Sequence, residues 1–325
     1  MSETMTMAKA LNAGLRRALE ADPKVVLAGE DIGQLGGVFR ITEHLQRDFG
    51  PERVIDSPLA ESGIVGTALG MALRGYRPVV EIQFDGFVYP AFDQIVSQVS
   101  RMRFRSMGRL GVPMVVRIPY GGAIGAIEHH SESPEAYFAH TPGLVVATPS
   151  TPLDAYWMIQ QAVASDDPVV FLEPKRRYHE KGEVDLTEPP LAFDAARVVL
   201  EGTDATLISY GPMVKTCVEA ALAASTEGRS LEVIDLRSVS PLDDATIRAS
   251  VEKTGRAIVV HEAIRSGGIG GEIAARLQEW CFYSLEAPVL RVTGYDLPYP
   301  PSRVEKNYLP DLDRILDAVD RSMAD

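Results

Sequence analysis

Several features that assign a chain to a common class are scarce or missing here. Only 2 cysteines occur among 325 residues, Cys217 and Cys281, and both lie in patterns typical of helix faces. Two buried thiols are therefore expected rather than a disulfide. The longest apolar runs, such as Val112–Val116 and Val169–Leu172, have the length of a buried strand and cannot cross a membrane. The N-terminal segment lacks a signal-peptide core and a cleavage site, which predicts a cytoplasmic protein.

Common motifs for phosphates and metals are missing as well. No Gly-x-x-x-x-Gly-Lys-Ser/Thr loop is present, and the glycine-rich Ser266–Glu272 is followed by Ile273 where a dinucleotide fingerprint needs a glycine. This segment is interpreted as a tight turn at the start of a helix. His129 and His130 are adjacent and have no cysteine nearby, unlike the ligands of a zinc site.

The charge is strongly acidic, with a formal net charge of −13. Such a balance argues against a nucleic-acid partner, because phosphate backbones are themselves anionic. A basic cluster formed by Arg101, Arg103, Arg105 and Arg109 is interpreted as a solvated or subunit-facing helix edge.

Short β-branched runs alternate with helical patterns along most of the chain. Strands of the first half are predicted at Val25–Ala28, Val54–Asp56, Pro78–Ile82, Met114–Ile118, Leu144–Ala147 and Val169–Leu172. Helices are predicted between them at Ile64–Leu73, Phe87–Phe104 and Pro152–Ala164. This alternation is typical of a mainly parallel sheet covered by helices, which makes the fold α/β.

The pattern breaks near Lys181–Ala195, where two adjacent prolines and several charges favour a linker. A second series of strands follows at Ala205–Ser209, Leu231–Leu236, Ala257–His261 and Val289–Val292. We therefore predict two α/β domains, residues 1–185 and 196–325, joined by a linker at 186–195.

Three segments of the first domain combine polar and aromatic groups. In Asp56–Gly70 a strand ends, a proline turns the chain and a helix begins with Glu61, although a helix-start glutamate favoured by the dipole explains this residue equally well. Glu81–Gln94 carries Phe84, Phe87, Tyr89 and Phe92 after a strand, as a site for a flat ligand would, or as core residues.

The third segment is the glycine-rich loop Gly121–Ser133 with His129 and His130. An imidazole titrates near neutrality, so a histidine on such a loop suits proton transfer, although a surface loop with incidental histidines is the alternative.

These segments, in this order, resemble the β subunits of the heteromeric thiamine-diphosphate-dependent 2-oxo acid dehydrogenases. The similarity extends over nearly the whole chain, through DSPLAESGIVG, EIQFDGFVYPAFDQ, HHSESPEAYFAHTPGL, DPVVFLEPKRRY, EVIDLRSVSPLD and VTGYDLPYP. It implies a pyrimidine-binding domain followed by a transketolase-type C-terminal domain, in agreement with the fold predicted from the pattern.

The resemblance also implies roles for individual residues. Glu61 matches the glutamate that hydrogen-bonds the aminopyrimidine ring of the cofactor, and Phe87 matches the aromatic residue that stacks on this ring. His130 matches a loop histidine assigned to proton transfer or to acyl transfer onto the lipoyl group. Glu30 and Asp93 match acids that link the paired active sites.

A K⁺ site of the family uses main-chain carbonyls that match Ala162 and Val163, with side chains in the following turn. The matching turn here carries Ser165 and Asp167, with Ser165 where some relatives have aspartate.

The family's diphosphate and Mg²⁺ are held by an α-subunit motif that begins Gly-Asp-Gly, and no Gly-Asp-Gly occurs in this chain. The resemblance thus implies half of an active site, completed by an α subunit in an assembly of two α and two β chains. The expected reaction is oxidative decarboxylation of a branched-chain 2-oxo acid, with transfer of the acyl group to the lipoyl domain of an acyltransferase core. That core would dock through its subunit-binding domain. Alternatives are a pyruvate or acetoin dehydrogenase β subunit and a non-catalytic scaffold for the core.

Overall fold

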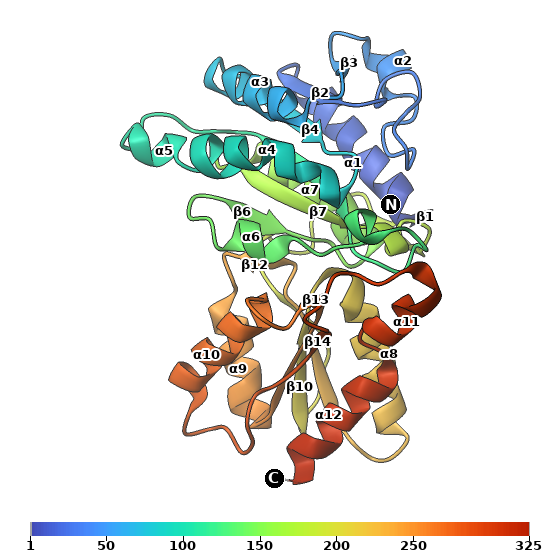
Figure 1. The fold of residues 1–325 in the computed structure, drawn as a ribbon, viewed down its shortest axis with the longest axis vertical. Helices are drawn as coiled ribbons and strands as arrows, with labels where there is room; N and C mark the ends of the chain where they lie inside the picture. The colour runs from blue at the N-terminus through green and yellow to red at the C-terminus, as the bar shows by residue number, and fades with distance from the viewer. Residues whose placement is uncertain (1, 325) are drawn as a thin grey trace. The chain divides into compact units, whose positions relative to one another are not determined.

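The computed structural model describes residues 2–324 and divides into two compact units (Figure 1). The first unit comprises the chain up to Tyr120 together with Tyr137–Phe193. The second comprises Gly121–Ala136 and the chain from Asp194 onward. The glycine-rich loop that carries His130 therefore folds with the second unit, although it lies between two strands of the first unit in the sequence.

The first unit begins with a strand and then alternates helices and strands. Its strands are β1 (Ser2–Thr6), β2 (Val25–Gly29), β3 (Val54–Asp56), β4 (Arg77–Glu81), β5 (Val115–Tyr120), β6 (Val145–Ala147), β7 (Val169–Pro174) and β8 (Lys181–Asp185). Its helices are α1 (Met7–Ala21), α2 (Leu45–Phe49), α3 (Glu61–Leu73), α4 (Tyr89–Asp93), α5 (Met102–Arg105) and α7 (Pro152–Ala164). The short α6 (Glu135–Ala139) straddles the boundary between the units in the sequence.

Parallel strands form the main sheet of the first unit, in the order β6-β7-β5-β4-β2-β3. Every residue of β5 and β7 is buried, as expected for central strands covered on both faces. Because the strands are parallel, their carboxyl ends meet at one edge of the sheet, where α/β folds place their ligands. A separate antiparallel ribbon joins β1 to β8.

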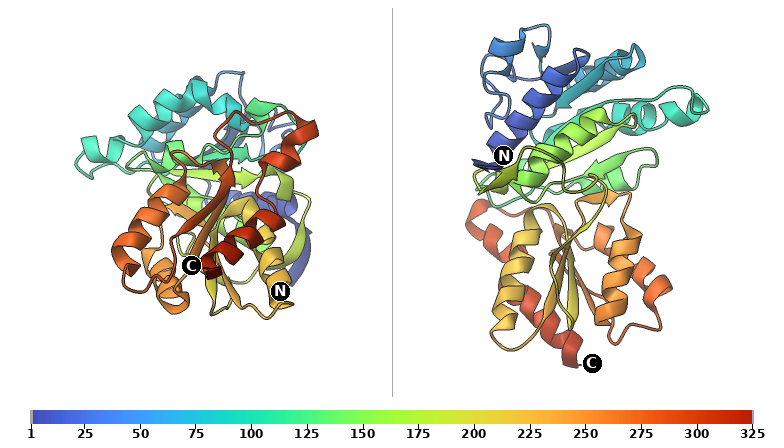
Figure 2. Two further views of the ribbon diagram at one scale, coloured as in Figure 1. Left: turned by 60° about the horizontal axis from the view of Figure 1, so that its bottom comes forward. Right: turned by 180° about the vertical axis from the view of Figure 1, so that it is seen from behind.

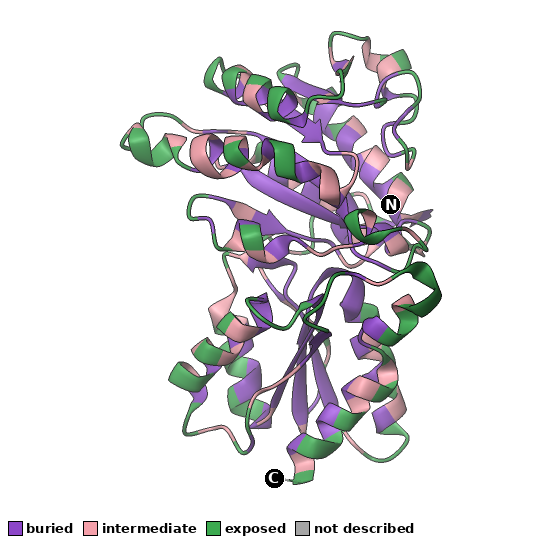
Figure 3. Ribbon diagram, in the orientation of Figure 1, coloured by how far each residue is buried: buried purple, intermediate pink, exposed green. Residues whose placement is uncertain are grey.

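The core of the first unit includes the contact between α1 and α7. These helices approach closely at Gly14, where an added Cβ would lie 2.5 Å from Ile159 Cγ2. Figure 3 shows the same division in both units: the central strands of each sheet are buried, whereas the helices have buried inner faces and exposed outer faces. Within residues 2–324, no helix combines the length and apolar character needed to cross a membrane.

The second unit is a smaller α/β sandwich. Its strands are β9 (Arg197–Leu200), β10 (Ala205–Ser209), β11 (Leu231–Asp235), β12 (Ser238–Ser240), β13 (Ala257–Ile264) and β14 (Leu290–Gly294). Its helices are α8 (Val214–Ser225), α9 (Asp244–Thr254), α10 (Ile269–Cys281), α11 (Glu305–Tyr308) and α12 (Leu312–Ala324).

The 5-stranded sheet of this unit has the order β14-β13-β10-β11-β9, with only β9 antiparallel to its neighbour. Figure 2 shows α8 and α12 on one face and α9 and α10 on the other. Both cysteines are buried thiols on α8 and α10, as predicted.

The α/β fold predicted from the sequence is confirmed, with two differences in detail. The continuous helix predicted over Phe87–Phe104 is broken into a 3₁₀ turn at Asp85–Val88, α4, a π-helical turn at Gln94–Val99 and α5. The break at Lys181–Ala195 is not all linker, because β8 pairs with the N-terminal β1. A strand whose partner lies near the start of the chain leaves no local signal in the sequence.

Candidate active site

Glu61 lies at the first position of α3, just after the turn that follows β3. The residue as a whole is only 7% exposed. Among residues 2–324, none donates a hydrogen bond to this carboxylate or forms an ion pair with it. Because a buried carboxyl without a partner is costly, this group is available to a ligand or to another chain.

Glu30 follows β2 and is buried near Glu61. Burial raises the pKa of the Glu30 carboxyl, and the negative charges of Glu61 and Asp31 raise it further. Asp31 itself has a left-handed backbone, with φ at 55°. Such a conformation is uncommon outside glycine and often marks functional turns. Glu30 and Glu61, both predicted site residues, thus lie close enough for the charge of Glu61 to affect the pKa of Glu30.

Phe87 lies in the 3₁₀ turn after β4 and is half-buried. Its ring packs edge-on against Phe84 with 5.9 Å between centroids. A buried ion pair between Asp85 and Lys175 fixes this turn, and the Lys175 ammonium lies 5.6 Å from the centre of the Phe84 ring. Since β2, β3 and β4 are parallel neighbours, Glu30, Glu61 and Phe87 all follow carboxyl ends at one edge of the sheet.

A buried ionic network supports this edge and was missed by the sequence reasoning. Arg117 of β5 donates to both oxygens of Glu173, at 2.6 and 2.9 Å, and to Glu81 at 2.7 Å. The Tyr178 hydroxyl donates to Glu173 at 2.6 Å. Burial opposes the charge on the guanidinium, but the two carboxylates more than compensate and raise the pKa of Arg117. The sequence did contain a signal for this network, because Glu81, Arg117 and Glu173 are charged residues within mostly apolar strands.

His130 ends a 3₁₀ turn of the second unit and is half-buried. Its Nδ1 lies 2.9 Å from the main-chain oxygen of His129. Because a carbonyl can only accept, this contact assigns a proton to Nδ1, so that Nε2 is the basic nitrogen of the neutral ring. The His129 ring is tilted by 58° from that of His130, with 4.3 Å between ring centres.

Polar contacts within the second unit anchor the loop that carries His130. The Gly122 amide donates to Glu262 at 3.1 Å, and the Ala123 amide donates to the Tyr299 hydroxyl at 3.0 Å. Further along, the Tyr210 hydroxyl donates to Glu135 at 2.6 Å. Burial raises the pKa of Glu135 to about 7, although the bond from Tyr210 lowers it.

Asp93 is exposed on α4, and it has no buried partner among residues 2–324. Its predicted role in linking two active sites therefore stays a prediction about the assembly.

The residues predicted to bind K⁺ already have partners inside the protein. Arg77 of β4 donates to the main-chain oxygens of Val163, at 3.1 Å, and Ser165, at 2.9 Å. The Ala162 oxygen accepts the Ser165 amide at 3.2 Å, and the Ser165 hydroxyl donates to the main-chain oxygen of Asp167 at 3.0 Å.

The Asp167 carboxylate pairs with Arg103, and Arg77 also pairs with Asp166 at 2.8 Å. A guanidinium thus takes the place of a cation at the C-terminal end of α7, where unpaired carbonyls and the helix dipole favour positive charge. These residues do not fit a K⁺ site. Within residues 2–324, no group of three or more acidic, histidine or cysteine side chains is placed to hold a metal ion.

Comparison with known domain families defines the class of this chain. The transketolase pyrimidine binding domain matches residues 3–181, and the transketolase C-terminal domain matches residues 194–315. A solved structure described as a split gene transketolase, an inactive beta4 tetramer, superposes with a TM-score of 0.80 over 98% of both chains at 22% identity. The protein is therefore a two-domain chain with the transketolase-type α/β fold.

Sequence identity to individual proteins assigns the chain to a narrower family. The pyruvate dehydrogenase E1 component subunit beta of Leifsonia xyli is 61% identical over 99% of this chain and 96% of its own length. The 3-methyl-2-oxobutanoate dehydrogenase subunit beta of Mycobacterium tuberculosis is 53% identical over 99% and 92%. The pyruvate dehydrogenase subunit beta of Bacillus subtilis is 48% identical over 96% and 97%. The chain belongs to the family of β subunits of thiamine-diphosphate-dependent 2-oxo acid dehydrogenases, as the sequence motifs predicted.

Proposed function

We propose that the first unit holds the aminopyrimidine ring of thiamine diphosphate. The observation that carries this proposal is the Glu61 carboxyl, which is buried, has no partner among the described residues and lies at the ligand-binding edge of a parallel sheet. Glu61 would hydrogen-bond a ring nitrogen, and the half-buried Phe87 would stack on the flat ring. Glu30, which titrates under the influence of Glu61, would link this carboxyl to the rest of the site.

When bound, thiamine diphosphate would supply the nucleophilic carbon and the electron sink that decarboxylation of a 2-oxo acid requires. The Glu61 carboxyl would hydrogen-bond a ring nitrogen and so keep a proton at that atom, without forming a covalent bond itself. His130 exchanges a proton through Nε2 during acyl transfer to the lipoyl group, because its Nδ1 is engaged with a main-chain oxygen.

The diphosphate and Mg²⁺ belong, in this proposal, to a separate α subunit. The support is the sequence, which contains no Gly-Asp-Gly motif. The active chain is then part of an assembly of two α and two β subunits, with Asp93 of α4 contributing to the link between sites. An acyltransferase core would bind through its subunit-binding domain.

For the substrate we propose a branched-chain 2-oxo acid. The segments EIQFDGFVYPAFDQ and SPEAYFAH resemble those of branched-chain enzymes, and the Mycobacterium tuberculosis relative named for 3-methyl-2-oxobutanoate is 53% identical. Pyruvate is the second candidate, favoured by the 61% identity to the Leifsonia xyli subunit.

Decarboxylation by the chain alone and by the chain co-expressed with an α subunit tests the proposal. Activity is expected only in the co-expressed sample, with a higher kcat/KM for 3-methyl-2-oxobutanoate than for pyruvate. A preference for pyruvate would overturn the substrate assignment and leave the division of the site intact. Turnover by the chain alone would overturn that division.

The variant Glu61→Gln tests the role of this carboxyl. Turnover of the co-expressed assembly should fall by about two orders of magnitude or more, as for other essential proton-handling groups. Glu52→Gln is the matched control, because Glu52 is exposed and also belongs to the first unit. Normal turnover of Glu61→Gln, with assembly intact by size-exclusion chromatography, would contradict the assigned role.

A further inference from the structure

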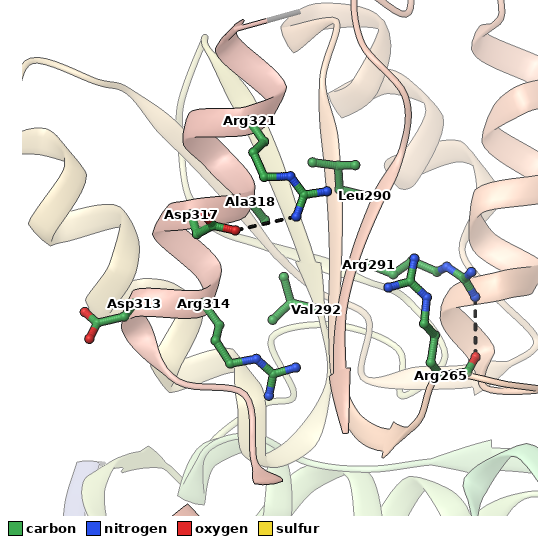
Figure 4. Close-up of a pocket in the computed structure, with 9 residues that line it drawn as sticks. All are labelled: Arg265, Leu290, Arg291, Val292, Asp313, Arg314, Asp317, Ala318 and Arg321. Atoms are coloured by element: carbon green, nitrogen blue, oxygen red, sulfur yellow. Dashed lines mark hydrogen bonds and ion pairs between the residues drawn. The ribbon is translucent and has the colours of Figure 1, made fainter. Parts of the chain in front are cut away.

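A groove in the second unit lies between α12 and β14, and none of the residues assigned to the cofactor lines it. It has a volume of about 370 Å³. Leu290, Val292 and Ala318 supply its apolar floor. Figure 4 shows Arg314 and Arg321 extending from α12 toward β14.

The side chains of two more arginines, Arg265 and Arg291, lie on the other side of β14, to which Arg291 itself belongs. Four guanidinium groups therefore flank this strand (Figure 4). This concentration of positive charge stands out in a chain whose formal net charge is −13. Two carboxylates, Asp313 and Asp317, also line the groove, which leaves an excess of positive charge.

The four arginine side chains differ in how many hydrogen bonds and ion pairs they form within the protein. Arg314 is held in place, because it donates to the main-chain oxygens of Tyr308 at 3.2 Å and Thr293 at 2.5 Å. Arg321, by contrast, has one long contact with Asp317, at 3.5 Å.

Arg291 donates to the main-chain oxygen of Arg265 at 3.4 Å. The Arg265 guanidinium donates no hydrogen bond to any residue in the described range 2–324, although its charge contributes to lowering the pKa of Asp296. Most of the donors around the groove are therefore available to an anionic partner.

The strand at the centre of these arginines is an edge strand. β14 pairs with β13 on one side and is the last strand in the order of the sheet. The Thr293 oxygen of this strand already accepts from Arg314, and the remaining outward N–H and C=O groups of an edge strand can bind a further strand from another chain.

We propose that the groove binds an acidic peptide segment as an extended strand added to β14. Arg314 and Arg321 are seven residues apart, which places them two turns or about 10 Å apart along the helix axis. An extended peptide advances about 3.3 Å per residue, so acidic side chains two to four residues apart can reach both.

A single phosphate is too small to contact both ends of the groove, and the acidic chain repels a nucleic-acid backbone. The apolar floor at Leu290 and Val292 accepts the peptide's aliphatic side chains. This inference does not depend on the proposed function, since the groove contains none of the residues assigned to the cofactor.

Binding of a fluorescein-labelled octapeptide of alternating glutamate and valine to the full chain tests the proposal. The double variant Arg265→Gln/Arg321→Gln should weaken binding by about fivefold or more, since each exposed charge pair contributes modestly. Arg303→Gln is the matched control, because Arg303 is exposed in the same unit and lies outside the groove. It should change the affinity by less than about twofold.

A second peptide isolates the backbone contribution. N-methylation of alternate amides leaves the charge unchanged and removes the donors that a strand needs, so this peptide should bind far more weakly. Equal binding of both peptides, equal weakening by the Arg303→Gln control, or no binding of the first peptide at about millimolar concentration would each overturn the proposal.

Discussion

The substitution Glu135→Gln is expected to stabilise the protein increasingly as the pH rises. Glu135 is fully buried, and one of its oxygens accepts from Tyr210 while the other has no partner among residues 2–324. Burial raises the pKa of this carboxyl from its ordinary value of 4.5 to about 7. The folded protein therefore keeps a proton on Glu135 over a range of pH in which the unfolded chain has lost it.

The sign of the effect follows from proton linkage. Where the folded state binds more protons than the unfolded state, the free energy of unfolding decreases as the pH rises. This decrease begins near the ordinary value of 4.5 and is complete above about 7. Because one pKa unit corresponds to about 1.4 kcal/mol, ionised Glu135 costs about 3 kcal/mol of stability at the upper end.

Glutamine resembles the protonated carboxyl in shape and cannot ionise. Its amide also introduces a pH-independent cost, because buried amide hydrogens need acceptors. The useful quantity is therefore the change of the mutational effect with pH. The variant should gain about 3 kcal/mol relative to the wild type between about pH 5 and about pH 8.

Urea unfolding at these two pH values measures the change. In a Trp157→Phe background the remaining Trp280 reports on the second unit, because the chain contains 2 tryptophans. Glu128→Gln, in the loop that precedes α6 and with an exposed side chain, is the control. The reasoning is refuted if Glu135→Gln has the same effect on stability at both pH values.

Three further predictions concern the first unit. Because the residues assigned to K⁺ already have protein partners, the thermal unfolding temperature of the wild type should be equal in KCl and in choline chloride of the same ionic strength. The variant Arg77→Met should lower the free energy of unfolding by about 1–3 kcal/mol, because the carbonyls of Val163 and Ser165 lose their donor. Stabilisation of the wild type by K⁺ would contradict the first part. Arg117→Met should destabilise by about 3–5 kcal/mol, because it leaves Glu81 and Glu173 buried without their cation; a smaller loss in chemical denaturation would show that both carboxyls are protonated. Gly143→Ala should destabilise by about 1–3 kcal/mol, since φ is 96° and the added methyl group would contact a main-chain oxygen, and wild-type stability in calorimetry would show that the turn adapts.

Local sequence signals predicted most of the regular elements. Pro152–Ala164 is a helix with the predicted bounds, and Val54–Asp56 and Ala205–Ser209 are strands with the predicted bounds. Each is encoded by its own residues: Thr151 caps the helix by accepting from the Asp154 amide, and proline occupies the first turn. The positions of Glu61 and Phe87 after strands were visible in the sequence as well, whereas their roles at the site came from the family resemblance and stay predictions.

Other features depend on residues far apart in the chain. The strand β8 exists because its partner β1 lies at the other end of the first unit, and Arg117 is neutralised by acids 36 and 56 residues away. A window of sequence cannot contain both partners of such a contact, so its pattern carries no signal for them.

The sequence by itself determined the α/β alternation, the two-domain class and the family, because periodicity and motif order are properties of neighbouring residues. Only the tertiary structure decided that Glu61 is buried without a partner among residues 2–324, that Arg77 takes the Val163 carbonyl assigned to K⁺, and that the loop of His130 folds with the second unit. The physical reason is that burial and pairing depend on which distant side chains meet. The same residues could be solvated in a different packing.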